Sequence, residues 1–255
     1  MTPHSERDGM RERLRKELAE YLARPHRTKK YREDARATLS KFFRETRNGK
    51  DGWVLLESLD KANGDTVTGS ELKAALRDQL VKIQSNRCCY CRRWLVNTAY
   101  ARPIEHILPR AHFRKFSLHF WNLALACTDC NTLKSDKLWG TVNPKRRSYP
   151  QPNEINDWYH PRFHVYDQHI RFIRLESNGT TFVVFLGLTK QGRTLCKSLL
   201  RHIAAKEMLI SNNATLSSCM ATLDEYGDRF NTEKAEKLRD FQNELSASVV
   251  RMIKT

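Results

Sequence analysis

Two Cys-x-x-Cys pairs constrain the fold of this chain more than any other feature of its sequence. The pairs are Cys88/Cys91 and Cys127/Cys130. Each has the ligand type and spacing of a knuckle that presents two thiolates to a zinc ion. Four unrelated buried thiols are the alternative, but they give no reason for the repeated spacing. Cys89 is a further possible ligand, although the spacing favours Cys88. The sequence therefore predicts a structural zinc site, in which four thiolates leave no position for water.

Polar residues that suit catalysis lie between and beside these pairs. Glu105 and His106 are adjacent, Asn122 follows, and Asn131 comes directly after the second pair. An imidazole near its unperturbed pKa of about 6.5 can take a proton at neutral pH. Carboxylate and amide oxygens are ligands that Mg²⁺ accepts. Adjacent strand residues point to opposite faces, so we expect a distortion or turn at Glu105-His106 if both share one site.

The stretch Cys88–Lys137 resembles the HNH endonucleases, the ββα-metal nuclease family, in the version with zinc knuckles. The order of the motif is Cys-x-x-Cys, an acidic-His pair, a central Asn, and Cys-x-x-Cys followed by His or Asn. Here Glu105 stands at the first motif position and Asn131 at the last, so the literal H-N-H letters are absent. Acidic-His-Asn-Asn variants occur in the family. The resemblance covers about a fifth of the chain.

The resemblance implies a metal-dependent endonuclease that hydrolyses DNA phosphodiester bonds. In this reading His106 is the general base, and Glu105 and Asn131 hold a catalytic Mg²⁺ or Mn²⁺. Asn122 supports the loop and helps to orient His106, while the four cysteines bind the structural Zn²⁺. Lys134 could contact a phosphate, but an exposed lysine near the start of a helix is an equally good interpretation. The candidates for contact with nucleic acid are Arg110, Arg114, Lys115 and Lys134.

The layout beyond the motif supports a second resemblance. The stretches HFWNLALACTDCN and HPRFHVYDQHIRF…GLTKQGR are similar to the HNH subunits of Septu and retron-type antiphage systems. That resemblance implies a role in bacterial antiphage defence beside an ATPase subunit. Two other functions stay open: a non-catalytic zinc-ribbon module that binds nucleic acid, and a docking subunit of an ATPase complex. The binding module gives no reason for a Glu-His pair at positions 105 and 106.

The charge of the chain favours a polyanionic partner. Lysine and arginine exceed aspartate and glutamate by 45 − 29 = 16, and neutralising phosphates releases counterions, which drives binding. No run of about twenty apolar residues is present, so no spanning helix is expected. The charged N-terminal stretch lacks the apolar region of a signal peptide, so we expect a cytoplasmic protein. In that compartment the seven cysteines are read as metal ligands and thiols rather than disulfides.

The periodicity predicts an α+β, mainly helical chain around a central ββα-metal (HNH) zinc-knuckle core, with an additional C-terminal β-hairpin. The expected regions are an N-terminal helical region at 1–84, the nuclease core at 85–142, and a C-terminal hairpin and helical region at 143–255. The N-terminal helices are rich in arginine and could follow a phosphate backbone, although a solvated face is the commoner reason for such charge. Residues 143–153 are expected to form a linker or a phosphate-contacting loop. The expected helices are 5–24, 28–47, 68–84, 190–209 and 232–254, and the hairpin turns at Ser177-Asn178-Gly179.

Overall fold

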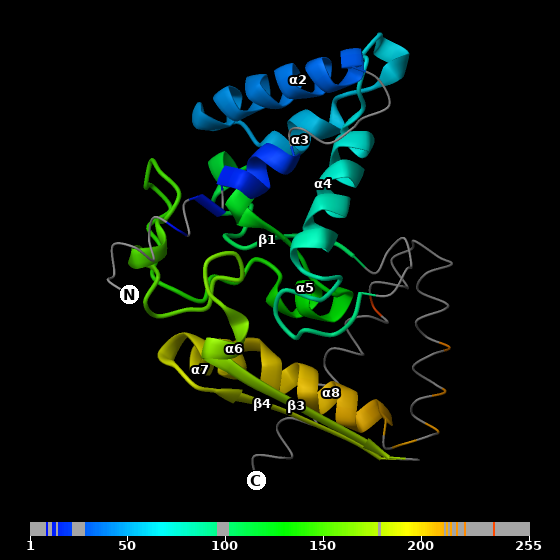
Figure 1. Ribbon diagram of the computed structural model, residues 1–255, viewed down its shortest axis with the longest axis vertical. Coiled ribbons are helices and arrows are strands. Elements are labelled where there is room, and N and C mark those ends of the chain that lie inside the picture. Colours follow the sequence, from blue (N-terminus) through cyan, green and yellow to red (C-terminus); the bar gives the residue numbers. More distant parts are fainter. Residues whose placement is uncertain are drawn as a thin grey trace. The chain divides into compact units, whose positions relative to one another are not determined.

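The computed structural model describes residues 29–95, 102–177 and 180–211, together with residues 9, 12, 13 and 15–21 and a few separate positions after 211. The described chain is α+β, as predicted, with helices and two small two-stranded sheets (Figure 1). It divides into two compact units. The first unit contains residues 1–155 and 160–164, and the second contains 156–159 and 165–255.

The N-terminal part of the first unit is helical. The described positions among residues 9–21 are helical, in line with the predicted first helix. Helix α2 (Lys29–Arg47) corresponds to the predicted helix 28–47, and it buries Ala35, Leu39 and Phe42 along one face. A short helix, α3 (Gly52–Glu57), lies outside the helices that the sequence predicted. Asp51 caps it by accepting a hydrogen bond from the Trp53 amide at 2.9 Å.

Helix α4 (Gly69–Ile83) connects this helical part to the cysteine-bearing segment. Thr68 and Glu71 form a reciprocal capping box at its start. At its end the Gln84 side chain bonds both backbone groups of Leu125, with distances of 2.7 Å to the amide and 2.9 Å to the carbonyl. The Leu125 carbonyl also accepts a hydrogen bond from the Cys89 amide at 2.9 Å. The end of helix α4 is therefore joined, through Leu125, to the first knuckle.

A short antiparallel pair of strands lies between the two cysteine pairs, and a helix begins within the second pair. Strand β1 (Ile104–His106) pairs with β2 (Leu123–Leu125), with Glu105 opposite Ala124. Helix α5 (Thr128–Lys134) follows, and the Cys127 sulfur accepts a hydrogen bond at its first turn. Strand β2 is buried along its whole length. Among its described residues, the first unit also contains four 3₁₀ turns: Lys61–Asn63, Arg114–Phe116, Phe120–Asn122 and Pro152–Glu154.

The second unit is built on the predicted hairpin. Strand β3 (Ile170–Ser177) pairs antiparallel with β4 (Thr180–Gly187), which confirms the predicted strands, while the turn at Asn178-Gly179 lies outside the described residues. The remaining elements are α6 (Tyr166–His169), α7 (Lys190–Leu195), a π-helical stretch (Cys196–Leu200) and α8 (Arg201–Ser211). The predicted helix 190–209 is thus present, with a π-helical turn inside it.

A close backbone contact fixes one glycine of this unit. A Cβ atom on Gly192 would lie 1.8 Å from the His169 carbonyl oxygen, so a larger residue would push the start of β3 away from α7. The predicted final helix, 232–254, lies outside the described residues apart from a helical position 237. Among the helices that the structure describes, none combines the length and apolar character needed to cross a membrane.

Candidate functional site

The four predicted cysteines come together in one buried cluster. The Sγ atoms of Cys88, Cys91, Cys127 and Cys130 all lie within 4.8 Å of one another. Cys91 Sγ and Cys127 Sγ are 3.7 Å apart. A tetrahedral zinc ion with Zn–S bonds of about 2.3 Å places its sulfurs about 3.8 Å apart, so the donor set fits that metal. Cys89 is buried but does not belong to the cluster, which resolves the choice between it and Cys88.

The backbone around the cluster is arranged to support thiolates. The Cys127 amide donates to Cys88 Sγ at 3.2 Å, and the Cys130 amide donates to Cys127 Sγ at 3.4 Å. An Arg93–Asp129 ion pair at 2.6 Å joins one knuckle to the other. Hydrogen bonds to the charged form of a thiol favour that form, which is the one that binds metal. The cluster can therefore hold a Zn²⁺ ion that fastens β1, β2 and α5 to the chain before them.

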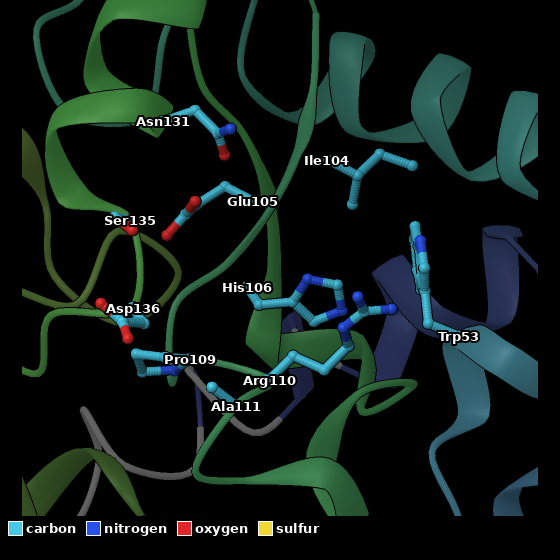
Figure 2. A pocket seen from close by; sticks show the side chains of 10 residues that line it. All are labelled: Trp53, Ile104, Glu105, His106, Pro109, Arg110, Ala111, Asn131, Ser135 and Asp136. Atoms are coloured by element: carbon cyan, nitrogen blue, oxygen red, sulfur yellow. The ribbon is translucent and has the colours of Figure 1, made fainter. Parts of the chain in front are cut away.

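A pocket of about 310 Å³ borders the end of β1. Figure 2 shows Glu105 and His106 extending to opposite sides of this strand. Asn131, Ser135 and Asp136 lie on the Glu105 side, and Trp53 and Arg110 lie on the His106 side. No distortion of β1 is needed, because the strand ends at His106 and the pocket reaches both of its faces. The pocket thus has an oxygen-rich side and a side formed by imidazole, indole and guanidinium groups.

The imidazole of His106 has a defined tautomer. Its Nε2 lies 3.0 Å from the Ser117 carbonyl oxygen, which can only accept, so Nε2 carries the proton and Nδ1 keeps its lone pair. Burial lowers the pKa of His106 to about 4, so the ring is neutral at pH 7. The Trp53 ring meets it edge-on, with centroids 4.8 Å apart. Because Ser117 Oγ also accepts a hydrogen bond from the Gly52 amide at 2.8 Å, α3 is fastened to the residue that orients His106.

The carboxylate of Glu105 is buried and held on one oxygen. Lys134 Nζ lies 2.5 Å from Glu105 Oε1, and the Tyr90 hydroxyl donates to the same oxygen at 3.2 Å. Lys134 Nζ also donates to the His106 carbonyl at 3.0 Å. Burial raises the pKa of Glu105, and the neighbouring Lys134 opposes that rise. Within the described part of the chain no hydrogen bond to Oε2 occurs, so this oxygen is available to a ligand in the pocket.

Lys134 is therefore buried rather than exposed, with 2% of its side chain accessible. The sequence left open a phosphate contact or an exposed lysine, and the structure places its ammonium group between Glu105 and the backbone of His106. An uncompensated charge inside a protein is costly, so each member of this pair depends on the other.

We expect Lys134→Met to lower the free energy of unfolding by about 3–5 kcal/mol, because it leaves the Glu105 carboxylate buried without its cation. Lys137→Met removes an exposed lysine from the same stretch and is the matched control. Denaturant unfolding of both variants measures the difference. The double variant Glu105→Gln/Lys134→Met should recover part of the loss, since it leaves no unpaired charge. Equal stability of Lys134→Met and Lys137→Met would contradict the buried pair.

Asn122 does not line the pocket. Its Oδ1 accepts from the Leu108 amide at 2.7 Å, and its Nδ2 donates to the carbonyls of Leu108 (3.1 Å) and Phe116 (3.0 Å). The side chain is fully buried. Asn122 thereby joins the two ends of the loop that connects His106 to Ser117, its orienting residue.

Comparison with known proteins agrees with this geometry. An HNH endonuclease family model matches residues 88–137. The matched segment contains the four cysteines, the strand that bears Glu105 and His106, and helix α5 with Asn131. The comparison with curated proteins and the comparison with solved structures found no match. The HNH match supports nuclease activity in general, and the cysteine cluster supports metal binding within the same segment.

The remaining predicted residues of the HNH segment take different places. Arg110 lines the pocket and lies 3.6 Å from Asp51, which precedes α3. Arg114 is exposed, and Lys115 lies over the ring of Phe116. Neither borders the pocket.

Sequence reasoning did not identify four residues of the site: Trp53, Tyr90, Ser135 and Asp136. Asp136 is in the matched segment and lines the pocket, directly after Ser135, which ends α5 with a φ of 51°. That left-handed conformation is uncommon for a residue other than glycine. Only its place five residues after Asn131 could have drawn attention to Asp136. Trp53 has no local signal, because tertiary packing of α3 brings it to the pocket.

Proposed function

We propose that this protein is a metal-dependent HNH endonuclease that hydrolyses DNA phosphodiester bonds. The observation that carries the proposal is that Glu105, His106 and Asn131 line one pocket inside the segment matched by the HNH family model. In this proposal β1, β2 and α5 form the ββα-metal core, and the cysteine cluster holds it together through Zn²⁺. A non-catalytic zinc module would need the cysteines but not the pocket.

The proposed base is His106 Nδ1, the nitrogen that the Ser117 contact leaves unprotonated. It takes a proton from a water molecule as the water oxygen forms a bond to phosphorus. The bond from phosphorus to the 3′ oxygen of the sugar breaks, and the departing oxygen takes up a proton from solvent. The fixed tautomer supports this role, because Nδ1 has no hydrogen-bond partner among the residues that the structure describes.

The oxygen-rich side of the pocket is proposed to hold Mg²⁺ or Mn²⁺. Its donors are the free oxygen of Glu105, the Asn131 side chain and the Asp136 carboxylate, and hard oxygen ligands suit both ions. When bound, such an ion neutralises charge on the scissile phosphate and on the departing oxygen. Because Lys134 and Tyr90 hold one oxygen of Glu105, the carboxylate has a fixed orientation before any ligand enters.

Contact with DNA is proposed to combine one pocket residue with a basic surface. Arg110 lies at the His106 side of the pocket, where a guanidinium can meet a phosphate. Arg114 and Lys115 follow it on the same loop, and Lys134 is proposed to act indirectly, by orienting Glu105 beside the phosphate.

We expect DNA affinity to fall steeply as salt concentration rises, with log K linear in log salt, because the chain carries a net charge of +16. Fluorescence anisotropy on labelled duplexes of two unrelated sequences measures both the slope and the selectivity. Similar affinities for the two sequences are expected. A binding constant that does not change between low and physiological salt would contradict the electrostatic account.

The proposed biological setting is bacterial antiphage defence in the cytoplasm, where the helices outside the HNH segment would dock an ATPase subunit. This part rests on the Septu and retron-type resemblance of the sequence beyond the motif. Affinity capture from the native host followed by an ATPase assay tests it. A monomeric, fully active nuclease that recovers no ATPase would count against it.

The substrate is tested by incubating the zinc-loaded protein with supercoiled plasmid, single-stranded DNA and RNA in the presence of Mg²⁺. Cleavage of plasmid is expected, with 3′-hydroxyl and 5′-phosphate ends that follow from breaking the bond to the 3′ oxygen. Binding without cleavage of any of the three substrates would favour the zinc-ribbon binding module instead.

A further inference from the structure

A chain of buried hydrogen bonds begins at His160, outside the HNH segment. His160 has no exposed surface. Its Nδ1 accepts a hydrogen bond from the Arg162 amide at 3.2 Å, so Nδ1 carries no proton and Nε2 must carry one. Nε2 lies 2.8 Å from the Tyr149 hydroxyl oxygen. His160 is therefore the donor in this bond and Tyr149 the acceptor.

The direction of the first bond fixes the next one. Because Tyr149 accepts from His160, its own hydroxyl proton is free to donate, and Asn122 Oδ1 lies 3.1 Å away. The Trp121 carbonyl, at 3.4 Å, is a more distant acceptor. Asn122 Oδ1 also accepts from the Leu108 amide at 2.7 Å. Two donors therefore meet this oxygen, which fixes the orientation of the Asn122 amide group.

The Asn122 side chain is connected to the proposed base, His106, through the loop after β1. Its Nδ2 group bonds the carbonyls of Leu108 and Phe116. Leu108 comes two residues after His106, and Phe116 directly precedes Ser117, whose carbonyl orients the His106 ring. The series of bonds thus runs from His160 through Tyr149 and Asn122 to both ends of the loop.

Ring packing holds the outer part of this series in place. His119 stacks on Tyr149 with centroids 4.2 Å apart, and Phe163 stacks on His160 at 3.9 Å. Tyr149 lies in the proline-rich, basic stretch 143–153, which from the sequence alone reads as a linker or a phosphate-contacting loop. Its ring is only 3% exposed. This stretch therefore also carries a buried side chain, Tyr149, that packs against residues of the HNH segment.

From these contacts we propose that Tyr149 and His160 are positioning residues for the proposed nuclease reaction. They fix the Asn122 amide, and through it the loop that sets the His106–Ser117 bond. The expected effect of these residues on catalysis rests on the proposed function, whereas their expected effect on the loop does not. It extends the functional machinery beyond the stretch 88–137 to residues 149 and 160.

The test compares Tyr149→Phe with Tyr21→Phe, which removes another buried tyrosine hydroxyl of the first unit. Hydrogen exchange at the Leu108 amide is measured in the full-length protein, together with kcat and KM for plasmid cleavage. Tyr149→Phe should speed Leu108 exchange and lower kcat by about 10- to 100-fold at similar KM, because small displacements of a catalytic group are costly. Tyr21→Phe should do neither. In an Asn122→Ala background the effect of Tyr149→Phe on kcat should disappear.

A second pair of variants guards against general destabilisation. The Nε2 amide of glutamine can donate to Tyr149 in place of the imidazole, so His160→Gln should retain more kcat than His160→Leu. Unchanged Leu108 exchange in Tyr149→Phe overturns the proposal, as does faster exchange with unchanged kcat in an active enzyme. Equal losses in both His160 variants also overturn it. Absence of cleavage by the wild type would reject the nuclease function, while Leu108 exchange would still decide whether the bonds act on the loop.

Discussion

His106→Ala is expected to reduce plasmid cleavage by about two to four orders of magnitude, the usual contribution of a general base. Zinc content and melting temperature should stay close to those of the wild type, because the ring's one hydrogen bond within the described part of the chain is to Ser117. The ring belongs to neither the cysteine cluster nor the Glu105–Lys134 pair. Single-turnover cleavage rates, elemental analysis and thermal unfolding measure the three quantities.

His112→Ala is the matched control, since it removes an exposed imidazole from the loop that follows. It should cleave at nearly the wild-type rate. If His106→Ala retains the rate of this control, His106 is not the base. If it loses zinc or melts far below the control, the loss of cleavage reports on folding rather than on proton transfer.

Cys130→Ser is expected to lose zinc and to lower the melting temperature by about 10 °C or more. Binding of a structural zinc contributes directly to folding, so weakening it by about 4 kcal/mol or more has an effect of this order in a chain of this size. Cys130 is fully buried, and its Sγ lies within 4.8 Å of the three other cluster sulfurs. Loss of cleavage should follow the loss of fold.

Cys196→Ser controls for the replacement of a buried thiol as such. Cys196 is buried in the second unit and does not belong to the cluster. This variant should keep its zinc and a melting temperature near that of the wild type. A Cys130→Ser protein that lacks zinc yet melts with the control would rule out a structural role for the cluster.

The features that the sequence predicted correctly are those with short-range chemical constraints. Two Cys-x-x-Cys pairs can present four thiolates to one metal whatever the path between them, so the cluster followed from spacing alone. The helix that Thr68 caps has a capping signal in its own sequence, and the strands of the hairpin have alternating apolar residues on either side of Asn-Gly. The HNH resemblance led us to expect Glu105 and His106 at one site, and both line the pocket, but without the distortion of the strand that their adjacency led us to expect.

The parts that sequence reasoning missed depend on contacts between distant stretches. Lys134 has nothing in its local pattern that indicates burial, and only the fold brings it against Glu105 and the backbone of His106. Trp53 reaches the pocket because Gly52 bonds to Ser117, which lies 65 positions further along the chain. Hydrophobic periodicity does not encode such pairings, and a buried lysine is rare enough that exposure is the natural expectation.

The central claim is that a divalent ion other than zinc activates this pocket. The most direct measurement is the cleavage rate of supercoiled plasmid by the zinc-loaded wild-type protein, first in EDTA under conditions where elemental analysis shows zinc retained, and then as Mg²⁺ is added in excess of the chelator. We expect no cleavage in EDTA and a rate that rises with free Mg²⁺ to saturation. Cleavage that proceeds equally in EDTA, or no cleavage at any concentration of Mg²⁺ or Mn²⁺ by folded, zinc-loaded protein, would contradict it.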